Sequence, residues 1–459
     1  MSETTTAATP NTVGAAATAA TNDTSVDEKP APGAYYALGV LLAAYILSFV
    51  DRNVMAVLIG PIRDDLQISD FQYSLLHGFA FSMFYIVLGI PIARLADHGN
   101  RKWIVTIGIF LWSVMCCLCG LARSVATLFV ARIGVGVGEA ALSPPAFSML
   151  SDLFPPARQA RAFAIYSLGV TVGGGLSAII GGFVYKYFAA TGGATLPLLG
   201  HVGPWQMTFV SVGAPGLLLV VLLGFIREPQ RRLDRDPASA GDGASLAEFW
   251  AWLVRHKRIY IGVMGANSLL TVMTYGMLAW FIEFLIRTYG VPRESAGLQF
   301  GLINIIAGSL GALVIGWLVQ PMVSRGISDA PARMLLVIAC LVALPTTIGP
   351  LCPTPQLAIL LACPAMFLLN GFYGPGVTAL QAITPNRMKA QVTALSLFFA
   401  NLFGLALGPT IVAMLTDFLF GDDQYLRYSL ALLPVVLCPL AALLAWQALR
   451  PYRELLEAR

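Results

Sequence analysis

Twelve apolar segments, each about as long as a bilayer is thick, alternate with short polar segments along the chain. A helix that crosses the hydrocarbon core needs about 20 mostly apolar residues. We therefore predict an all-α polytopic membrane protein with twelve transmembrane helices in two halves of six. The expected helices cover residues 34–55, 71–95, 102–121, 125–149, 159–188, 205–227, 259–287, 294–320, 331–350, 355–379, 386–417 and 424–449.

A long polar interruption follows the sixth apolar segment. It begins with a stretch rich in Pro, Gly and charged residues, after which Ser245 and Glu248 have the spacing of a capping box. The short segment that follows has an apolar side and a basic end, which is typical of a helix lying at a membrane surface. We expect a cytoplasmic linker at 228–258 between an N-terminal bundle at 34–227 and a C-terminal bundle at 259–450.

The two ends of the chain are predicted to be tails. Residues 1–33 are rich in Thr, Ala, Pro and Asn, and they lack the basic and apolar regions of a signal peptide, so we expect disorder. Residues 451–459 are expected to form a short C-terminal tail. Only 11% of all residues are charged, against roughly 25% in soluble domains. Most side chains must therefore face lipid or other helices.

The basic residues are distributed unevenly between the two sides of this map. Of the 28 Lys and Arg residues, twenty fall on one side and six on the other, while Arg52 and Arg132 lie within predicted helices. Such an excess marks the cytoplasmic side. We expect a multi-pass protein of the plasma (inner) membrane with both termini in the cytoplasm. The small net charge of +4 is compatible with anionic membrane lipids as neighbours and gives no reason to expect nucleic acid.

Four ionisable residues lie at membrane depth, where charge is costly and usually functional. Asp51 and Arg52 are in the first predicted helix, and Arg132 and Glu139 are in the fourth. Arg132 and Glu139 are about two turns apart and share one helix face. All four side chains can meet if both helices face one cavity.

These four residues predict a proton-coupled transporter. A neighbouring arginine favours the ionised form of a carboxylate, whereas loss of water favours the protonated form. A cavity that opens and closes would therefore couple proton binding to alternating access, with Asp51 and Glu139 as proton carriers. Arg52 and Arg132 are candidates for binding an anionic substrate group. The residues also permit static ion pairs that only fix helix packing.

The second half offers candidates for an aromatic and polar cavity wall. A cavity charged on one side and aromatic on the other suits an amphiphile with a polar head and an acyl tail. The same residues can instead pack within the bundle, and Glu283 can form an interfacial pair with Arg287 one turn away. The candidates are Tyr275, Trp280, Glu283, Asn370 and Tyr373.

Several other functional classes lack their motifs. Gly134 and Gly136 do not form a nucleotide loop, because no strand precedes them and no Walker lysine follows. The four histidines offer no HExxH, and the seven cysteines show no paired CxxC spacing for zinc. We expect a monomer that is not an enzyme, binds no metal and uses no cofactor besides the proton as coupling ion.

The loop after the second predicted helix reads ARLADHGNRK. Asp97 lies beside basic residues, and Asn100 can adopt the left-handed conformation usually given to glycine. A carboxylate here can hold a neighbouring helix end and act as a cytoplasmic gate, or it can belong to a solvated turn. The expected gate residues are Asp97, Asn100, Arg101 and Lys102.

This loop resembles the G-x-x-x-D-R-x-G-R-K motif of the major facilitator superfamily, from which it departs at Ala93, His98 and Asn100. Arg132 with Gly134, Gly136 and Gly138 resembles the helix 4 motif of the same family. More narrowly, the chain resembles the spinster-like branch of lysolipid and sphingolipid transporters. The pieces that carry this resemblance are Phe49-Val-Asp51-Arg52, Gly136-Val-Gly138-Glu139-Ala140 and Ser151-Asp152-Leu153-Phe154-Pro155.

The resemblance implies two pseudo-symmetric bundles whose helices 1, 4, 7 and 10 line a central cavity. It also implies proton-coupled secondary active transport of an amphiphilic lipid by alternating access, with a lysophospholipid or sphingolipid as substrate. The anion–cation symporter branch has a similar Asp-Arg pair and a similar Gly-Glu-Ala. A proton-linked symporter of small organic anions therefore remains the alternative.

Overall fold

The computed structural model describes residues 30–197, 200–231 and 245–458, so most of the predicted N-terminal tail lies outside the described residues. The described chain contains twelve helical spans long and apolar enough to cross a membrane, as predicted. The first six comprise α1 (Ala34–Asn53) with η1 (Val54–Val57), α3 (Asp70–Ser74) with η2 (Leu75–Phe79) and α4 (Ala80–His98), α5 (Arg101–Cys119), α6 (Val125–Glu139) with α7 (Ser143–Leu153), α8 (Pro156–Thr191) and α9 (Pro204–Gly224).

The second six spans have the same kind of interrupted helices. They comprise α11 (Lys257–Tyr289), α12 (Arg293–Ile303) with η3 (Asn304–Gly308) and α13 (Ser309–Ser324), α14 (Ala330–Leu351), α15 (Pro355–Gly371) with α16 (Tyr373–Ile383), α17 (Lys389–Phe399) with η5 (Ala400–Leu407), α18 (Gly408–Met414) and η6 (Leu415–Phe420), and α19 (Leu426–Glu457). Short helices connect some spans: α2 (Ile59–Leu66), α10 (Leu246–Arg255), η4 (Asn386–Met388) and η7 (Asp423–Tyr425).

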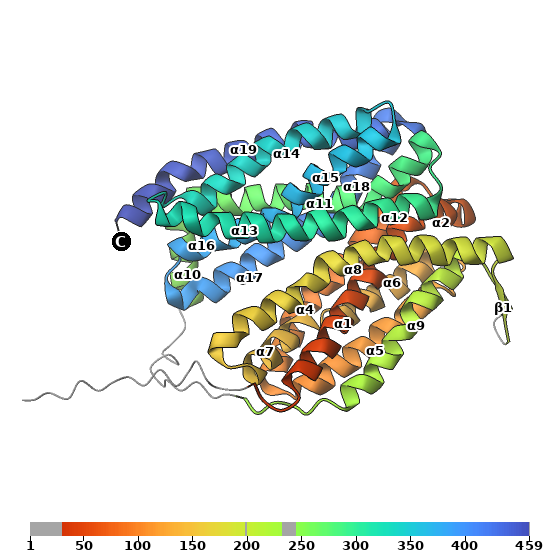
Figure 1. Ribbon diagram of the computed structural model, residues 1–459, viewed down its shortest axis with the longest axis horizontal. Helices are drawn as coiled ribbons and strands as arrows, with labels where there is room; N and C mark the ends of the chain where they lie inside the picture. The colour runs from red at the N-terminus through yellow and green to blue at the C-terminus, as the bar shows by residue number, and fades with distance from the viewer. Residues whose placement is uncertain (1–29, 198–199, 232–244, 459) are drawn as a thin grey trace, which may run out of the picture.

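The spans form two bundles of six that lie side by side (Figure 1). Helix α1 begins and α19 ends at the same end of the molecule, which we call the terminal end. The other end, which we call the far end, carries α2 and a hairpin of β1 (Ala194–Leu196) and β2 (Gly200–Val202). The hairpin was not predicted from the sequence. An even number of spans requires both termini to lie at one end.

The bundles touch mainly in their middle and far parts and diverge toward the terminal end (Figure 1). The most extensive contact between them joins α8 to α12, and further contacts join α3 to α18 and η1 to α11. At the first of these, a Cβ atom placed on Gly175 would lie 2.5 Å from the carbonyl oxygen of Gly301. Glycine is needed at Gly175 because the two backbones approach so closely.

Three local features refine the expected helices. The predicted helix 125–149 is interrupted between α6 and α7, where Pro144 and Pro145 occupy the first turn of α7 and cannot donate backbone hydrogen bonds. Helix α19 continues to Glu457, through residues expected to form a tail. The predicted amphipathic helix is α10, and its capping box forms as expected, with Ser245 Oγ accepting from the backbone N–H of Glu248.

Candidate functional site

The centre of the N-terminal bundle holds an ion pair between α1 and α6. The Arg52 guanidinium donates to Glu139 Oε2 from Nη2 at 2.5 Å and from Nε at 3.1 Å. Three aromatic rings surround the same guanidinium, with centroids 4.5 Å away for Phe49, 4.6 Å for Phe81 and 5.2 Å for Tyr85. Cation–π attraction and the ion pair together fix the position of Arg52.

Asp51 and Arg132 complete a charge cluster with this pair, but both are fully buried. Adjacent residues on an α-helix point about 100° apart, so Asp51 turns away from Arg52 toward Trp112 and Cys116 of α5. Neither carboxylate oxygen of Asp51 has a hydrogen-bond partner among the described residues. The four charges were predicted to meet, and they do, but all four side chains are buried, with Arg52 the most exposed at 6%.

Arg132 interacts with both acids of the cluster without a hydrogen bond to either. Its Nη2 lies 3.4 Å from the carbonyl oxygens of Arg52 and His77, while Nε and Nη1 have no partner within the described chain. With all four side chains ionised, the charge cluster is neutral. Protonation of either acid leaves one positive charge without its counterion.

The C-terminal bundle faces Arg52 with tyrosines. Tyr275 of α11 lies close enough to interact with the Arg52 guanidinium, and Tyr373 of α16 lies near Tyr275 and Tyr85. Tyr373 is 39% exposed. The structure thus brings two of the predicted cavity residues to the space opposite Arg52.

The other predicted cavity residues have different surroundings. Trp280 is fully buried, and its Nε1–H donates to the carbonyl of Pro409 at 2.9 Å. Asn370 donates to the carbonyl of Met366 at 3.0 Å and lies beside Asn304, which itself donates across the bundle interface. These are packing contacts between helices, so the geometry favours a structural role for Trp280 and Asn370.

A network of ion pairs closes the far end between the bundles. Asp70 of α3 accepts from Arg287 of α11 at 2.7 and 2.8 Å and pairs with Arg63 of α2 at 2.9 Å. Arg63 also pairs with Asp423 of η7 at 2.8 Å. Glu283 pairs with Arg287 at 2.9 Å, as predicted for an i,i+4 pair, and lies within this network. We call these five residues the far-end network.

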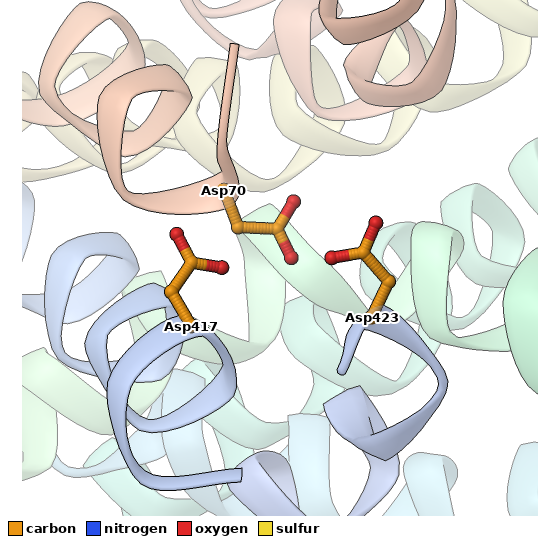
Figure 2. A group of neighbouring side chains, drawn as sticks. All are labelled: Asp70, Asp417 and Asp423. Carbon is orange, nitrogen blue, oxygen red and sulfur yellow. The ribbon is translucent and has the colours of Figure 1, made fainter. Parts of the chain in front are cut away.

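Three carboxylates of this region turn toward one another (Figure 2). Asp70 comes from the N-terminal bundle, and Asp417 and Asp423 come from the C-terminal bundle; one oxygen of each lies within 4.8 Å of the others. Carboxylates in this arrangement can ligate a cation. Here two arginines already neutralise Asp70, and Asp417 Oδ2 accepts from the backbone N–H of Phe71 at 2.7 Å. The cluster therefore works as a contact between bundles.

At the terminal end, the predicted gate residues hold parts of the N-terminal bundle together. Arg101 is buried and forms ion pairs with Asp152 and Glu228, and it also donates to Ser148 Oγ. Lys102 donates from Nζ to the carbonyl of Gly224 at 2.8 Å. The sequence predicted a role for Arg101 but not for Glu228, which belongs to no motif of its own.

The Asp97 side chain and the Asn100 backbone are arranged differently from what the gate hypothesis considered. Asn100 has φ of −80° and caps α5, because its Oδ1 accepts from the backbone N–H of Trp103; it does not adopt the left-handed conformation that was considered for it. The Asp97 side chain is exposed, and its backbone carbonyl accepts from Arg231. Arg231, which the sequence reading missed, also donates to the carbonyls of Ala96 and Gly99 and so neutralises the C-terminal end of α4.

Comparisons with known proteins agree with this architecture. A model of the Major Facilitator Superfamily matches residues 41–413. The chain is 28% identical to the "MFS-type efflux pump" of Mycolicibacterium smegmatis over 92% of this chain and 94% of that protein. It is 26% identical to the "Probable L-galactonate transporter" of Escherichia coli K12 over 83% of each.

The crystal structure of a bacterial homolog of the human lysosomal transporter Spinster, inward-facing and unoccupied, is also similar. It matches with a TM-score of 0.80 and 26% identity, over 92% of this chain and 98% of that one. The predicted fold of two six-helix bundles is confirmed, and the resemblance to the spinster-like branch is supported.

Proposed function

Because the chain belongs to the Major Facilitator Superfamily, and is thus a membrane transporter and not an enzyme, we propose that it moves amphiphilic lipids by proton-coupled alternating access. The lipid is of the lysophospholipid or sphingolipid type. The observation that carries this proposal is the position of Arg52, which is held by Glu139 and aromatic rings and faces Tyr275 of the other bundle. An anionic head group is the ligand that suits such a site.

The terminal end is proposed to face the cytoplasm, in the plasma (inner) membrane. Most of the Lys and Arg residues that the structure describes belong to segments at this end, which agrees with the charge bias of cytoplasmic loops. The bundles diverge here and are joined by ion pairs at the far end. The described conformation would then be open to the cytoplasm.

Proton coupling follows from competition for Arg52. Glu139 and an anionic head group cannot both pair fully with one guanidinium. Protonation of Glu139 would release Arg52 to bind the head group, and the arriving negative charge would restore neutrality to the charge cluster. Asp51 is proposed as the other site for the coupled proton, since a buried carboxylate without a hydrogen-bond partner is far less costly when it is neutral. The charge cluster with a bound head group is neutral only when one of the two acids is protonated and the other is ionised.

The substrate class is proposed from the walls of the passage. Arg52 supplies a single positive charge, whereas Phe49, Tyr85, Tyr275 and Tyr373 supply aromatic surface that suits an apolar tail. The second candidate is a small organic anion, which would bind the same arginine. The similarity to an L-galactonate transporter favours this alternative.

The proton gradient is sufficient for accumulation. One proton crossing about 100 mV contributes ~2.3 kcal/mol, and one unit of pH difference adds ~1.4 kcal/mol. Together they would sustain a substrate gradient of several hundred-fold.

The test is uptake into proteoliposomes of a lysophospholipid and of galactonate, with and without an inward proton gradient. We expect the lysophospholipid to accumulate with the gradient. Asp51→Asn and Glu139→Gln should retain binding but lose the response to the gradient. Asp64→Asn and Glu454→Gln are matched controls, since both acids are exposed.

The outcomes separate the parts of the proposal. Galactonate uptake without lysophospholipid uptake would select the organic-anion alternative. Gradient-dependent uptake that is unchanged in both charge-cluster variants would show that neither acid carries the coupled proton.

A further inference from the structure

An apolar groove runs along the C-terminal bundle, separate from the charge cluster. Its floor is α11, its walls are α17 with η5 and α19, and α10 covers its terminal end. Its volume is about 520 Å³, and representative lining residues are Lys257, Met264, Leu269, Phe403 and Leu444. Helix α19 packs chiefly on α11 and α14 of its own bundle. Two lining side chains, Ile261 and Phe403, are 60% and 38% exposed. The groove is thus open at the surface of the membrane-spanning bundle, where lipid can enter it.

The length and chemistry of the groove suit an acyl chain. The lining runs along α11 from Lys257 to Val272, which is about 22 Å at a rise of ~1.5 Å per residue. One leaflet of a hydrocarbon core is about 15 Å deep, half of ~30 Å. The groove is therefore longer than one leaflet is deep, so an acyl chain from one leaflet would contact aliphatic and aromatic side chains along its whole length.

The terminal end of the groove is positively charged. Lys257 is the one charged residue of the lining, and Arg255 and Arg258 flank it on exposed positions. None of the ion pairs found between described residues involves these three cations. An anionic group at the terminal end of the groove could therefore pair with these cations without displacing a carboxylate that already pairs with them.

Helix α10 places this end of the groove at the membrane surface. Phe249 and Leu253 pack into the protein, whereas Leu246, Trp250 and Val254 form an exposed stripe on another face of the helix. Such a stripe with Trp is typical of a helix lying at the boundary between head groups and hydrocarbon. The cations beside α10 are thus at the level of lipid head groups.

We propose that this groove binds one anionic phospholipid from the leaflet at the terminal end, with an acyl chain along α11 and the phosphate beside Lys257. In the proposed orientation this is the cytoplasmic leaflet, which is rich in anionic lipid. The lipid is a resident ligand and not the transported substrate, because no residue of the charge cluster lines the groove. The site does not depend on which substrate is transported.

The test is native mass spectrometry of the full chain in detergent, titrated with phosphatidylglycerol or phosphatidylcholine that carry the same acyl chains. We expect one tightly retained lipid and at least tenfold higher affinity for phosphatidylglycerol. Lys257→Gln should abolish this preference. Leu269→Trp should lower retention of both lipids at least tenfold, because the indole would fill the groove. Leu395→Trp, on the opposite wall, repeats the filling test independently.

Two matched controls should behave like the wild type. Arg325→Gln removes an exposed cation from the same bundle, and Leu344→Trp adds an indole at an exposed position of α14. Thermal unfolding of each variant verifies that it is folded. Equal affinity for the two lipids, or retention that both groove-filling variants leave unchanged, would overturn the proposal and leave only unspecific annular lipid.

Discussion

Removing the charge of Asp70 should open the far end of the transporter. Asp70→Asn keeps the size of the side chain but weakens its bidentate contact with Arg287, which joins the two bundles. The pair between Arg63 and Asp423 also joins the bundles and remains in the variant. The substitution thus removes part of the far-end network and leaves the fold of each bundle in place.

The size of the expected shift follows from the burial of the ion pair between Asp70 and Arg287. Asp70 is fully buried, and the Arg287 side chain is 9% exposed. Breaking a buried pair by removing one charge costs about 3–5 kcal/mol. Because Arg287 keeps Glu283 as a partner, we take the lower value, about 3 kcal/mol. A free-energy change of this size shifts an equilibrium between closed and open far ends roughly 100-fold toward open.

The assay is a distance measurement by double electron–electron resonance between spin labels at Asp64 and Asp422, two exposed residues at the far end of opposite bundles. Labels carried by a noncanonical amino acid leave the seven native cysteines unchanged. We expect a population at longer distance in Asp70→Asn that is small in the wild type. Asp65→Asn is the control, since the one hydrogen bond found for the Asp65 side chain among the described residues is donated by Trp205 Nε1–H of its own bundle. Identical distance distributions in all three proteins would refute the reasoning.

Three further substitutions test other contacts. Gly175→Val should reduce transport more than tenfold without loss of membrane insertion, because the valine side chain would meet the facing backbone of α12. Gly316→Val introduces the same side chain at a position with open space and should transport normally in the same uptake assay. Arg101→Gln should lower the melting temperature in detergent by several degrees, since it breaks buried ion pairs worth about 3–5 kcal/mol, and an unchanged melting temperature would contradict this. The Tyr275 hydroxyl is expected to assist Arg52 in substrate binding. Tyr275→Phe should therefore raise KM about fivefold at constant kcat, since one hydrogen bond contributes ~1 kcal/mol. A fall in kcat alone would argue against a binding role.

Local patterns were sufficient for the fold. A spanning helix is specified by the length and hydropathy of its own segment, because the bilayer is the solvent and every backbone group must be satisfied within the helix. The twelve spans and the capping box at Ser245 and Glu248 follow from such patterns. The break between α6 and α7 was not predicted, because the apolar run continues through it; only Pro144 and Pro145, which suit the first turn of a helix, mark where α7 begins.

By itself, the sequence determined which charges lie at membrane depth, and the spacing of Arg132 and Glu139 placed them on one helix. Only the tertiary structure decided their partners: Arg52 pairs with Glu139 across 87 residues, and Arg287 pairs with Asp70 across 217. The helical rotation between adjacent residues then directs Asp51 toward α5 while Arg52 reaches Glu139 of α6. Hydropathy is a property of each segment alone, whereas an ion pair depends on how helices rotate and pack against one another, and that information is distributed over the whole chain.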